Sequence, residues 1–234
     1  MKVNVETDFH PRLTDWHLRK VLQWINPLDL AGIEYIRLLR GEDAGPNETG
    51  QATYLRSPVC VGEYSNPNLK LKNPKAPYIT IYTRPFYYGI PWLFRYSPVA
   101  TLRMAFVLAH EVGHHLIARK GYIFAANETY KPYGMDDERE EGTANRYAVD
   151  LVRRMSARWY YRIGHWLSNK ISDWYYNFGQ AAWEKGEYDE AAYNWFSSHC
   201  ANPENHDAAL AYKRALAKIN TRPKSNKRLE RTRR

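Results

Sequence analysis

The sequence predicts an α+β fold, in which a small mixed sheet packs on two long helices and a segment made only of helices follows. Helix and strand patterns alternate up to residue 96, long helical patterns occupy residues 98–120 and start again near residue 136, and residues 159–220 contain helical patterns alone. Hydrophobic residues make up 44% of the 234 residues, so the chain can bury a proper core.

The first part of the chain is expected to contain one helix and three strands. Thr14 is a good N-cap for a helix that ends before Pro27. β-branched and aromatic residues predict strands at 33–39 and 59–64, and most strongly at 78–83, where a proline stands near each end of the run.

A long helix is predicted at residues 98–120. Ser97 offers a hydroxyl cap, and Pro98 takes the first helical position, where proline is well tolerated. Gly121 is well placed to end the helix. Apolar and small residues recur at three and four residues and give the helix one buried stripe, formed by Leu102, Ala105, Phe106, Ala109, Gly113 and Leu116.

This helix carries His-Glu-Val-Gly-His at positions 110–114, the HExxH pattern of zinc hydrolases. Residues four apart lie on one face of a helix, so His110 and His114 can offer two imidazole nitrogens to one Zn²⁺ ion. Glu111 lies about 100° around the helix, where its carboxylate can act as a general base on water without binding the metal. The plain alternative is a core helix with two histidines at its edge.

A catalytic zinc needs a third protein ligand besides two histidines. The acidic run at 136–141 opens a second helix, in which Glu141 is the first candidate and Glu140 the second. The earlier acidic residues of the run are explained by the helix dipole alone. Ala144 would let the two helices approach closely, and Asn145 could orient a ligand histidine through its second ring nitrogen.

Two stretches, RMAFVLAHEVGH at 103–114 and EGTANRYA at 141–148, resemble the motifs of the ImmA/IrrE group of gluzincin-like metallopeptidases. The resemblance covers roughly residues 27–155, and only these two stretches are specific. Tyr147 stands where the family usually has phenylalanine, and the family's leucine-rich, proline-ended continuation is weaker here. The resemblance implies a zincin-like catalytic domain with Glu141 as third ligand. It also implies a cytosolic peptidase, and several members of the group cut DNA-bound transcriptional repressors.

The substrate side of the site is less defined. In zinc peptidases of this kind an edge strand often pairs with the substrate backbone, so residues 78–83 are either such an edge or a plain internal strand. Aromatic residues within 87–96 either wall the cleft or belong to the core. A second stabiliser of the oxyanion is also needed, and its candidates are Tyr122, Tyr133, His115 and His165.

Most of the net charge of +9 lies in residues 221–234, which carry +6. This basic tail is expected to be disordered and could make weak contact with nucleic acid or an acidic partner. Neither Cys60 nor Cys200 belongs to a cluster of metal-ligating residue types, and two reduced thiols are a simpler interpretation than a disulfide. The first residues lack the apolar segment of a secretory signal peptide, and no apolar run approaches the about 20 residues needed to span a bilayer. We therefore expect a cytoplasmic protein with a protein or peptide substrate and no membrane partner.

Residues 159–220 are expected to form a helical appendage with spacing like that of a tetratricopeptide repeat (TPR), or else a simple helical hairpin that completes the core. Gly186 marks the turn between the paired helices, and a single repeat must pack on another domain to be stable. The chain is therefore divided into a zincin-like metallopeptidase domain at 1–158, a TPR-like appendage at 159–220 and the basic tail. The repeat positions are filled by Trp174, Gly179, Ala191, Trp195 and Pro203.

Three function classes remain open on the sequence. A zinc metallopeptidase is preferred, and a zinc amidohydrolase that is not a peptidase would use the same ligands. The third class is a zinc-stabilised protein-binding module. Glu111 argues against that class because a structural zinc site needs no general base.

Overall fold

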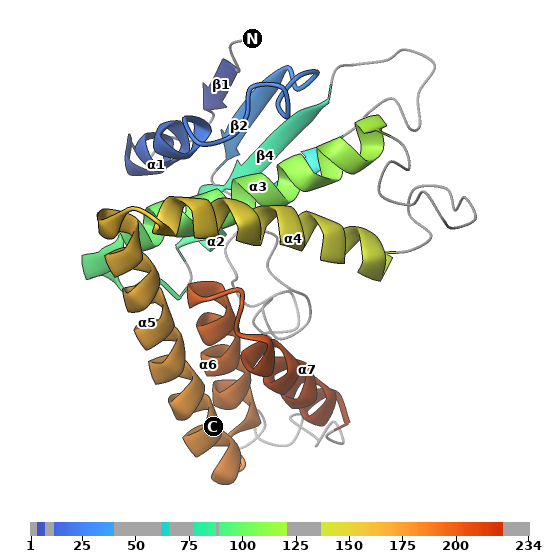
Figure 1. Cartoon of the computed structure of the whole chain (residues 1–234). Helices are drawn as coiled ribbons and strands as arrows, with labels where there is room; N and C mark the ends of the chain where they lie inside the picture. Colours follow the sequence, from blue (N-terminus) through green and yellow to red (C-terminus); the bar gives the residue numbers. More distant parts are fainter. Residues whose placement is uncertain are drawn as a thin grey trace, which may run out of the picture.

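The computed structural model describes residues 4–7, 12–39, 62–65, 77–87, 89–120 and 137–221. The chain folds as α+β, with a four-stranded sheet and long helices (Figure 1). The strands are β1 (Asn4–Thr7), β2 (Tyr35–Leu39), β3 (Gly62–Ser65) and β4 (Tyr78–Tyr82). The helices before the site are α1 (Arg12–Leu22), α2 (Thr83–Phe86) and the 3₁₀ turn η3 (Trp92–Phe94); the others are α3 (Pro98–Lys120), α4 (Asp137–Ser156), α5 (Trp159–Glu184), α6 (Tyr188–Ala201) and α7 (His206–Thr221).

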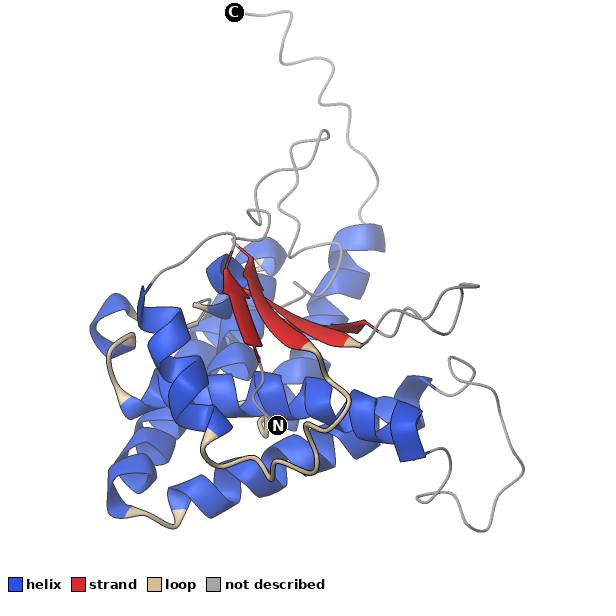
Figure 2. Cartoon of the chain, turned by 90° about the horizontal axis from the view of Figure 1, so that it is seen from above, coloured by secondary structure: helices blue, strands red, loops and turns tan. Residues whose placement is uncertain are grey.

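The sheet has the strand order β1-β2-β4-β3, with β3 antiparallel to β4 and the other pairs parallel. The strongest predicted strand, β4, is therefore internal, and its alternative role as a substrate-binding edge is wrong. The edges are β1 and β3. In register, Ile36 pairs with Ile79 and Leu38 with Ile81, and all four are fully buried in the main core. Figure 2 shows the sheet lying against one side of the helices.

The start of α3 agrees with the capping prediction. The backbone N–H of Val99 donates to Ser97 Oγ at 3.2 Å, and the hydroxyl of Ser97 itself donates to the carbonyl of Phe94 at 2.7 Å. By contrast, α1 begins at Arg12, so Thr14 is not its N-cap. Thr14 is buried inside the first turn and shares a 3.0 Å hydrogen bond with the hydroxyl of Tyr87.

The two long helices α3 and α4 pack very closely along the middle of the molecule (Figure 1). A Cβ atom added at Gly113 would lie 2.7 Å from Cα and 3.1 Å from Cβ of Ala144, closer than side chains tolerate. Glycine at 113 and alanine at 144 therefore set the distance between the helices, as expected for Ala144. Because of this close contact, side chains of α3 and α4 that flank it lie near one another.

The last three helices pack on one another and share a second core cluster, which contains Trp195, Phe196 and Tyr212. The expected helix pair is present, and Gly186 between α5 and α6 has φ +77°, a conformation that favours glycine. Gly179 lies directly against the ring of Trp195. The division of the chain at residue 158 stays a prediction, although a short turn at 157–158 does separate α4 from α5.

Cys200 is a buried free thiol, whereas Cys60 lies outside the described residues. The basic tail beyond Thr221 lies outside them as well. Among the helices that the structure describes, none has both the length and the apolar character needed to cross a bilayer.

Candidate metal centre

Two histidines of α3 and one glutamate of α4 converge on a single point. The Nε2 atoms of His110 and His114 lie 3.1 Å apart. The carboxylate of Glu141 faces both, with Oε2 at 3.3 Å from His110 Nε2 and Oε1 at 3.2 Å from His114 Nε2. One donor atom from each residue lies within 4.8 Å of the others, and the group could hold a metal ion.

The outer nitrogen of each histidine is held by a side chain of α4. Nδ1 of His110 lies 3.0 Å from Oδ1 of Asn145, and Nδ1 of His114 lies 2.9 Å from Oε1 of Glu140. Both oxygens can only accept, so each Nδ1 carries the proton and donates it. In the neutral imidazole this leaves the lone pair on Nε2, directed at the shared point.

Glu140, the second candidate for the third ligand, is therefore not placed as a metal ligand. It lies one residue before Glu141, and this turns its side chain about 100° around the helix, onto the outer side of His114. The helices run antiparallel, so that Asn145 meets His110 while Glu140 meets His114 one turn further along α3. The sequence showed both acidic residues but not this alignment.

The electrostatics of the group favour a positive charge. Burial alone would lower the pKa of His114, but the hydrogen bonds that it donates to Glu141 and Glu140 and the charge of Glu111 outweigh it and raise the pKa to about 9. Hydrogen bonds from His110 and His114 hold the pKa of Glu141 well below its usual range. A cation at this point would meet the carboxylate of Glu141, whose side chain is 52% exposed, and the negative charges of Glu111 and Glu140 act on His114 beside it.

The glutamate of the motif, Glu111, is buried, with 6% of its surface exposed. Its negative charge contributes to the raised pKa of His114. It approaches from the α3 side, whereas Glu140 and Glu141 approach from α4.

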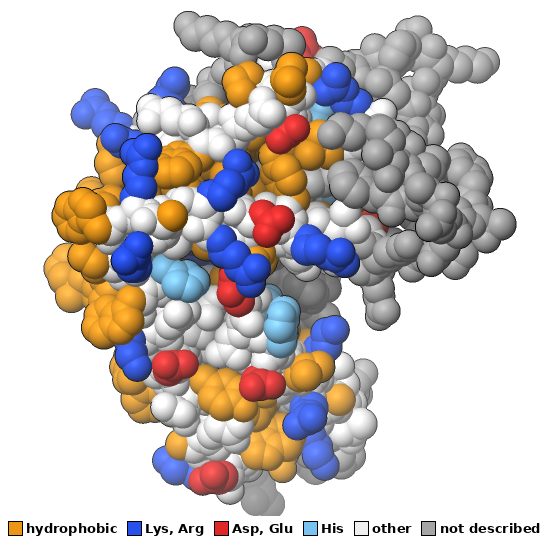
Figure 3. All heavy atoms as spheres, in the orientation of Figure 1, with side chains coloured by type: hydrophobic (Ala, Val, Ile, Leu, Met, Phe, Trp, Pro, Cys, Tyr) orange, Lys and Arg blue, Asp and Glu red, His pale blue; other side chains and the backbone are white. Residues whose placement is uncertain are grey.

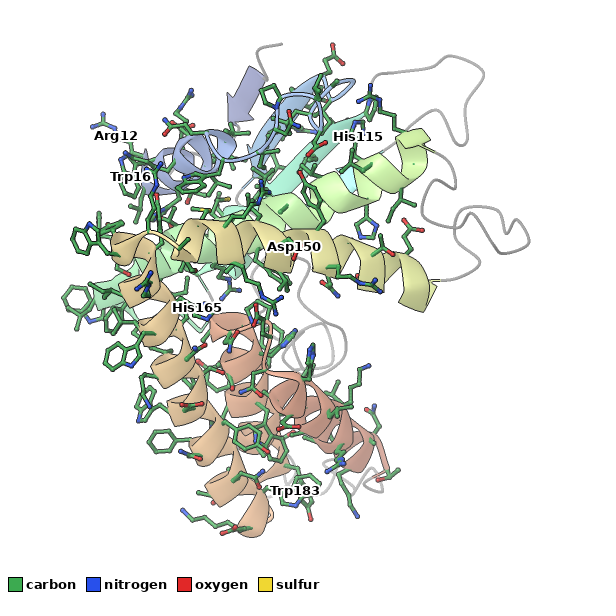
Figure 4. The ribbon with its side chains drawn as sticks, viewed as in Figure 1. Arg12, Trp16, His115, Asp150, His165 and Trp183 are labelled. Atoms are coloured by element: carbon green, nitrogen blue, oxygen red, sulfur yellow. The ribbon has the colours of Figure 1, made fainter. Side chains whose placement is uncertain are left out.

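The structure describes two of the four candidates for a second oxyanion stabiliser, and one of these two faces away from the metal group. His115 is 2% exposed, and its Nε2 lies 3.0 Å from the carbonyl oxygen of Ala31, so it faces the loop after α1 rather than the metal group. His165 belongs to α5 and lies below α4 in the view of Figure 4. Tyr122 and Tyr133 lie outside the described residues.

The loop between α1 and β2 is fixed to both long helices, and sequence reasoning missed this support. Arg119 of α3 donates to the carbonyl oxygens of Leu28 and Ala31 at 3.0 and 2.9 Å. Tyr147 of α4 donates its hydroxyl to Oδ2 of Asp29 at 2.6 Å. The hydroxyl that distinguishes Tyr147 from phenylalanine thus has a partner, which a pattern of motif residues could not reveal.

The edge strand β3 packs against α3, the helix that carries the histidines. Its outer edge is therefore the sheet edge next to this helix.

Comparison of the chain with protein-family models, with curated proteins and with solved structures gave no match.

Proposed function

We propose that the chain is a zinc-dependent metallopeptidase that hydrolyses a peptide bond in an intracellular protein. The observation that carries the proposal is the convergence of His110, His114 and Glu141 with both outer histidine nitrogens held. Two imidazole nitrogens and one carboxylate oxygen are the ligand set of many catalytic zinc sites.

The spacing of the donor atoms fits this metal. Ligand distances of about 2.0–2.1 Å in a tetrahedron correspond to donor–donor distances of about 3.3–3.4 Å. The two Nε2 atoms lie 3.1 Å apart, and each is close to one carboxylate oxygen of Glu141, His110 to Oε2 at 3.3 Å and His114 to Oε1 at 3.2 Å. The geometry matches a small ion better than a larger one such as calcium, which prefers six to eight oxygen ligands.

Each residue then has a defined task. Asn145 and Glu140 keep the protons of the two histidines on Nδ1, so that both Nε2 atoms stay available as ligands. Glu111 accepts a proton from the attacking water and returns it to the leaving amine. Zinc, when bound, would polarise the scissile carbonyl and acidify the water.

The substrate backbone is expected to lie along the outer edge of β3. An extended peptide can add to an exposed sheet edge through main-chain hydrogen bonds, which tolerate many side chains. This edge replaces β4, which lies inside the sheet. The proposal includes a zincin-like fold for the catalytic domain, as the resemblance to the ImmA/IrrE group implies.

The test compares wild type with Glu111→Gln, both loaded with zinc, on a library of unstructured peptides read by mass spectrometry. We expect new termini with wild type alone, and equal zinc content in both proteins. Hydrolysis of small amides without cleavage of any peptide would move the assignment to the amidohydrolase class. Zinc retained without any hydrolysis would support the binding module.

The substrate class that the family resemblance suggests is a DNA-bound transcriptional regulator. Cells that overproduce the active chain should contain a shortened DNA-binding protein that is intact in cells with Glu111→Gln. If the two sets of DNA-binding proteins have the same termini, this substrate class is wrong even where peptide cleavage is found in vitro.

A further inference from the structure

The chain exposes an unusual amount of aromatic surface outside the metal group. Five of its eight tryptophans are at least 41% exposed. Large aromatic side chains normally contribute to cores or interfaces, so a contiguous exposed set indicates a function. Six exposed side chains of η3, the turn after it and α5 form what we call the aromatic surface: Trp92 (72% exposed), Leu93 (64%), Tyr96 (76%), Trp159 (72%), Ile163 (49%) and Trp166 (57%).

On α5 these side chains form one face. Trp159, Ile163 and Trp166 are spaced by four and three residues, so they line up along the helix. The opposite face is buried, and Gly164 on it packs directly against Pro98 at the start of α3. Because the opposite face of α5 packs against the rest of the molecule, its aromatic face points toward solvent.

The 3₁₀ turn η3 lies beside this helix. Phe94 packs into a small core cluster with Val99 and Ile171, which joins η3 and the start of α3 to α5. Its neighbours in sequence, Trp92 and Leu93, are exposed. Figure 3 shows hydrophobic side chains gathered along the edge of the molecule where α5 and the start of α3 lie.

The segments that carry the aromatic surface are basic. Residues 151–172 contain five Lys or Arg and no Asp or Glu, and residues 89–110 contain the exposed Arg95, the buried Arg103 and no acidic residue. Arg95, Arg158 and Arg162 are all exposed. The first acidic residue along α5 is Asp173, which lies 3.9 Å from Lys170.

We propose that the aromatic surface docks on an anionic lipid bilayer. Tryptophan and tyrosine are favoured at the level of lipid headgroups, and arginines attract anionic lipids. Five of the six members expose more than half of their area, which suits separate insertion into a soft surface better than the lining of a pocket. The expectation of no membrane partner rested on the lack of a long apolar run, and this surface combines segments more than 60 residues apart.

The full chain is mixed with vesicles of phosphatidylcholine alone or with phosphatidylserine, and bound protein is measured by sedimentation. Wild type should bind the vesicles that contain phosphatidylserine, and added salt should weaken this binding. The double variant Trp159→Gln/Trp166→Gln should bind about tenfold or more weakly. Arg162→Glu should weaken binding about 30-fold, because it changes the surface by two unit charges.

Leu28→Gln is the matched control, since Leu28 is 73% exposed but lies in the loop before β2. It should bind as wild type does. Zinc content and circular dichroism show that each variant is folded. Glu111→Gln should also bind as wild type does, so the result is independent of the peptidase proposal.

Four results would overturn the inference. The first is no binding to vesicles that contain phosphatidylserine, and the second is equal binding to neutral vesicles. The third is an equal loss of binding in Leu28→Gln. The fourth is self-association without lipid that Trp159→Gln/Trp166→Gln abolishes, which would assign the surface to a second copy of the chain.

Discussion

Replacing Gly113 with alanine tests the packing that assembles the metal group. The added Cβ would lie 2.7 Å from Cα of Ala144, whereas carbon atoms pack at about 3.5–4.0 Å, so α3 and α4 must separate by about 1 Å. Overpacking of this kind costs about 1–3 kcal/mol of unfolding free energy. The same shift moves Glu141 away from His110 and His114, although metal ligands tolerate only about 0.2 Å.

We therefore expect Gly113→Ala to unfold at lower denaturant concentration and to bind zinc roughly tenfold to 100-fold more weakly. Circular dichroism in urea gives the first quantity, and competition with a chelating dye gives the second. Gly142→Ala is the matched control, because a Cβ there meets no atom within 4 Å. It should gain up to about 1 kcal/mol of stability and bind zinc as wild type does. The reasoning fails if the two alanine variants behave alike in both assays.

Two further predictions concern the surroundings of the site, and a third concerns His199 of α6. Glu140→Ala should weaken zinc binding about tenfold to 100-fold by freeing His114, and Glu140→Gln, which keeps an acceptor, should lose less; equal loss in both would contradict an orienting role. Tyr147→Phe should lower the unfolding free energy by about 1–2 kcal/mol, through the lost bond to Asp29, and leave zinc content unchanged in metal analysis. Burial lowers the pKa of His199 from 6.5 to about 4, so the unfolded chain binds the proton more tightly between these values. The stabilising effect of the neutral histidine is complete above pH about 6.5 and is lost as the pH falls toward 4; His199→Gln should flatten this part of the curve of urea midpoint against pH, and an unchanged curve would exclude the effect.

Local signals predicted the helices of the site well. Ser97, Pro98 and the spacing of apolar residues were enough to locate α3, because a helix is defined by neighbours in sequence. Three of the four strands were predicted, but β1 and the order of the strands in the sheet were not. Pairing joins residues far apart in the chain, and residues 78–83 would look the same as an edge or as the internal strand that β4 is.

The candidate site was predictable where one helix determined it. The spacing of His110 and His114 places both on one face of α3 whatever surrounds them. The task of Glu140 depends instead on how α4 is aligned against α3, which no residue type encodes alone. The exposure of aromatic residues such as Trp92 could not be predicted either, because an apolar side chain is assigned to the core until its neighbours in the fold are known.

The most direct test of the central claim is the metal content of purified wild type, Glu111→Gln, His114→Ala and Glu141→Ala, measured by mass spectrometry. The account predicts about one zinc per chain in wild type and Glu111→Gln, and clear loss in the other two. A folded wild type that holds little zinc, even after zinc is added back, would contradict it.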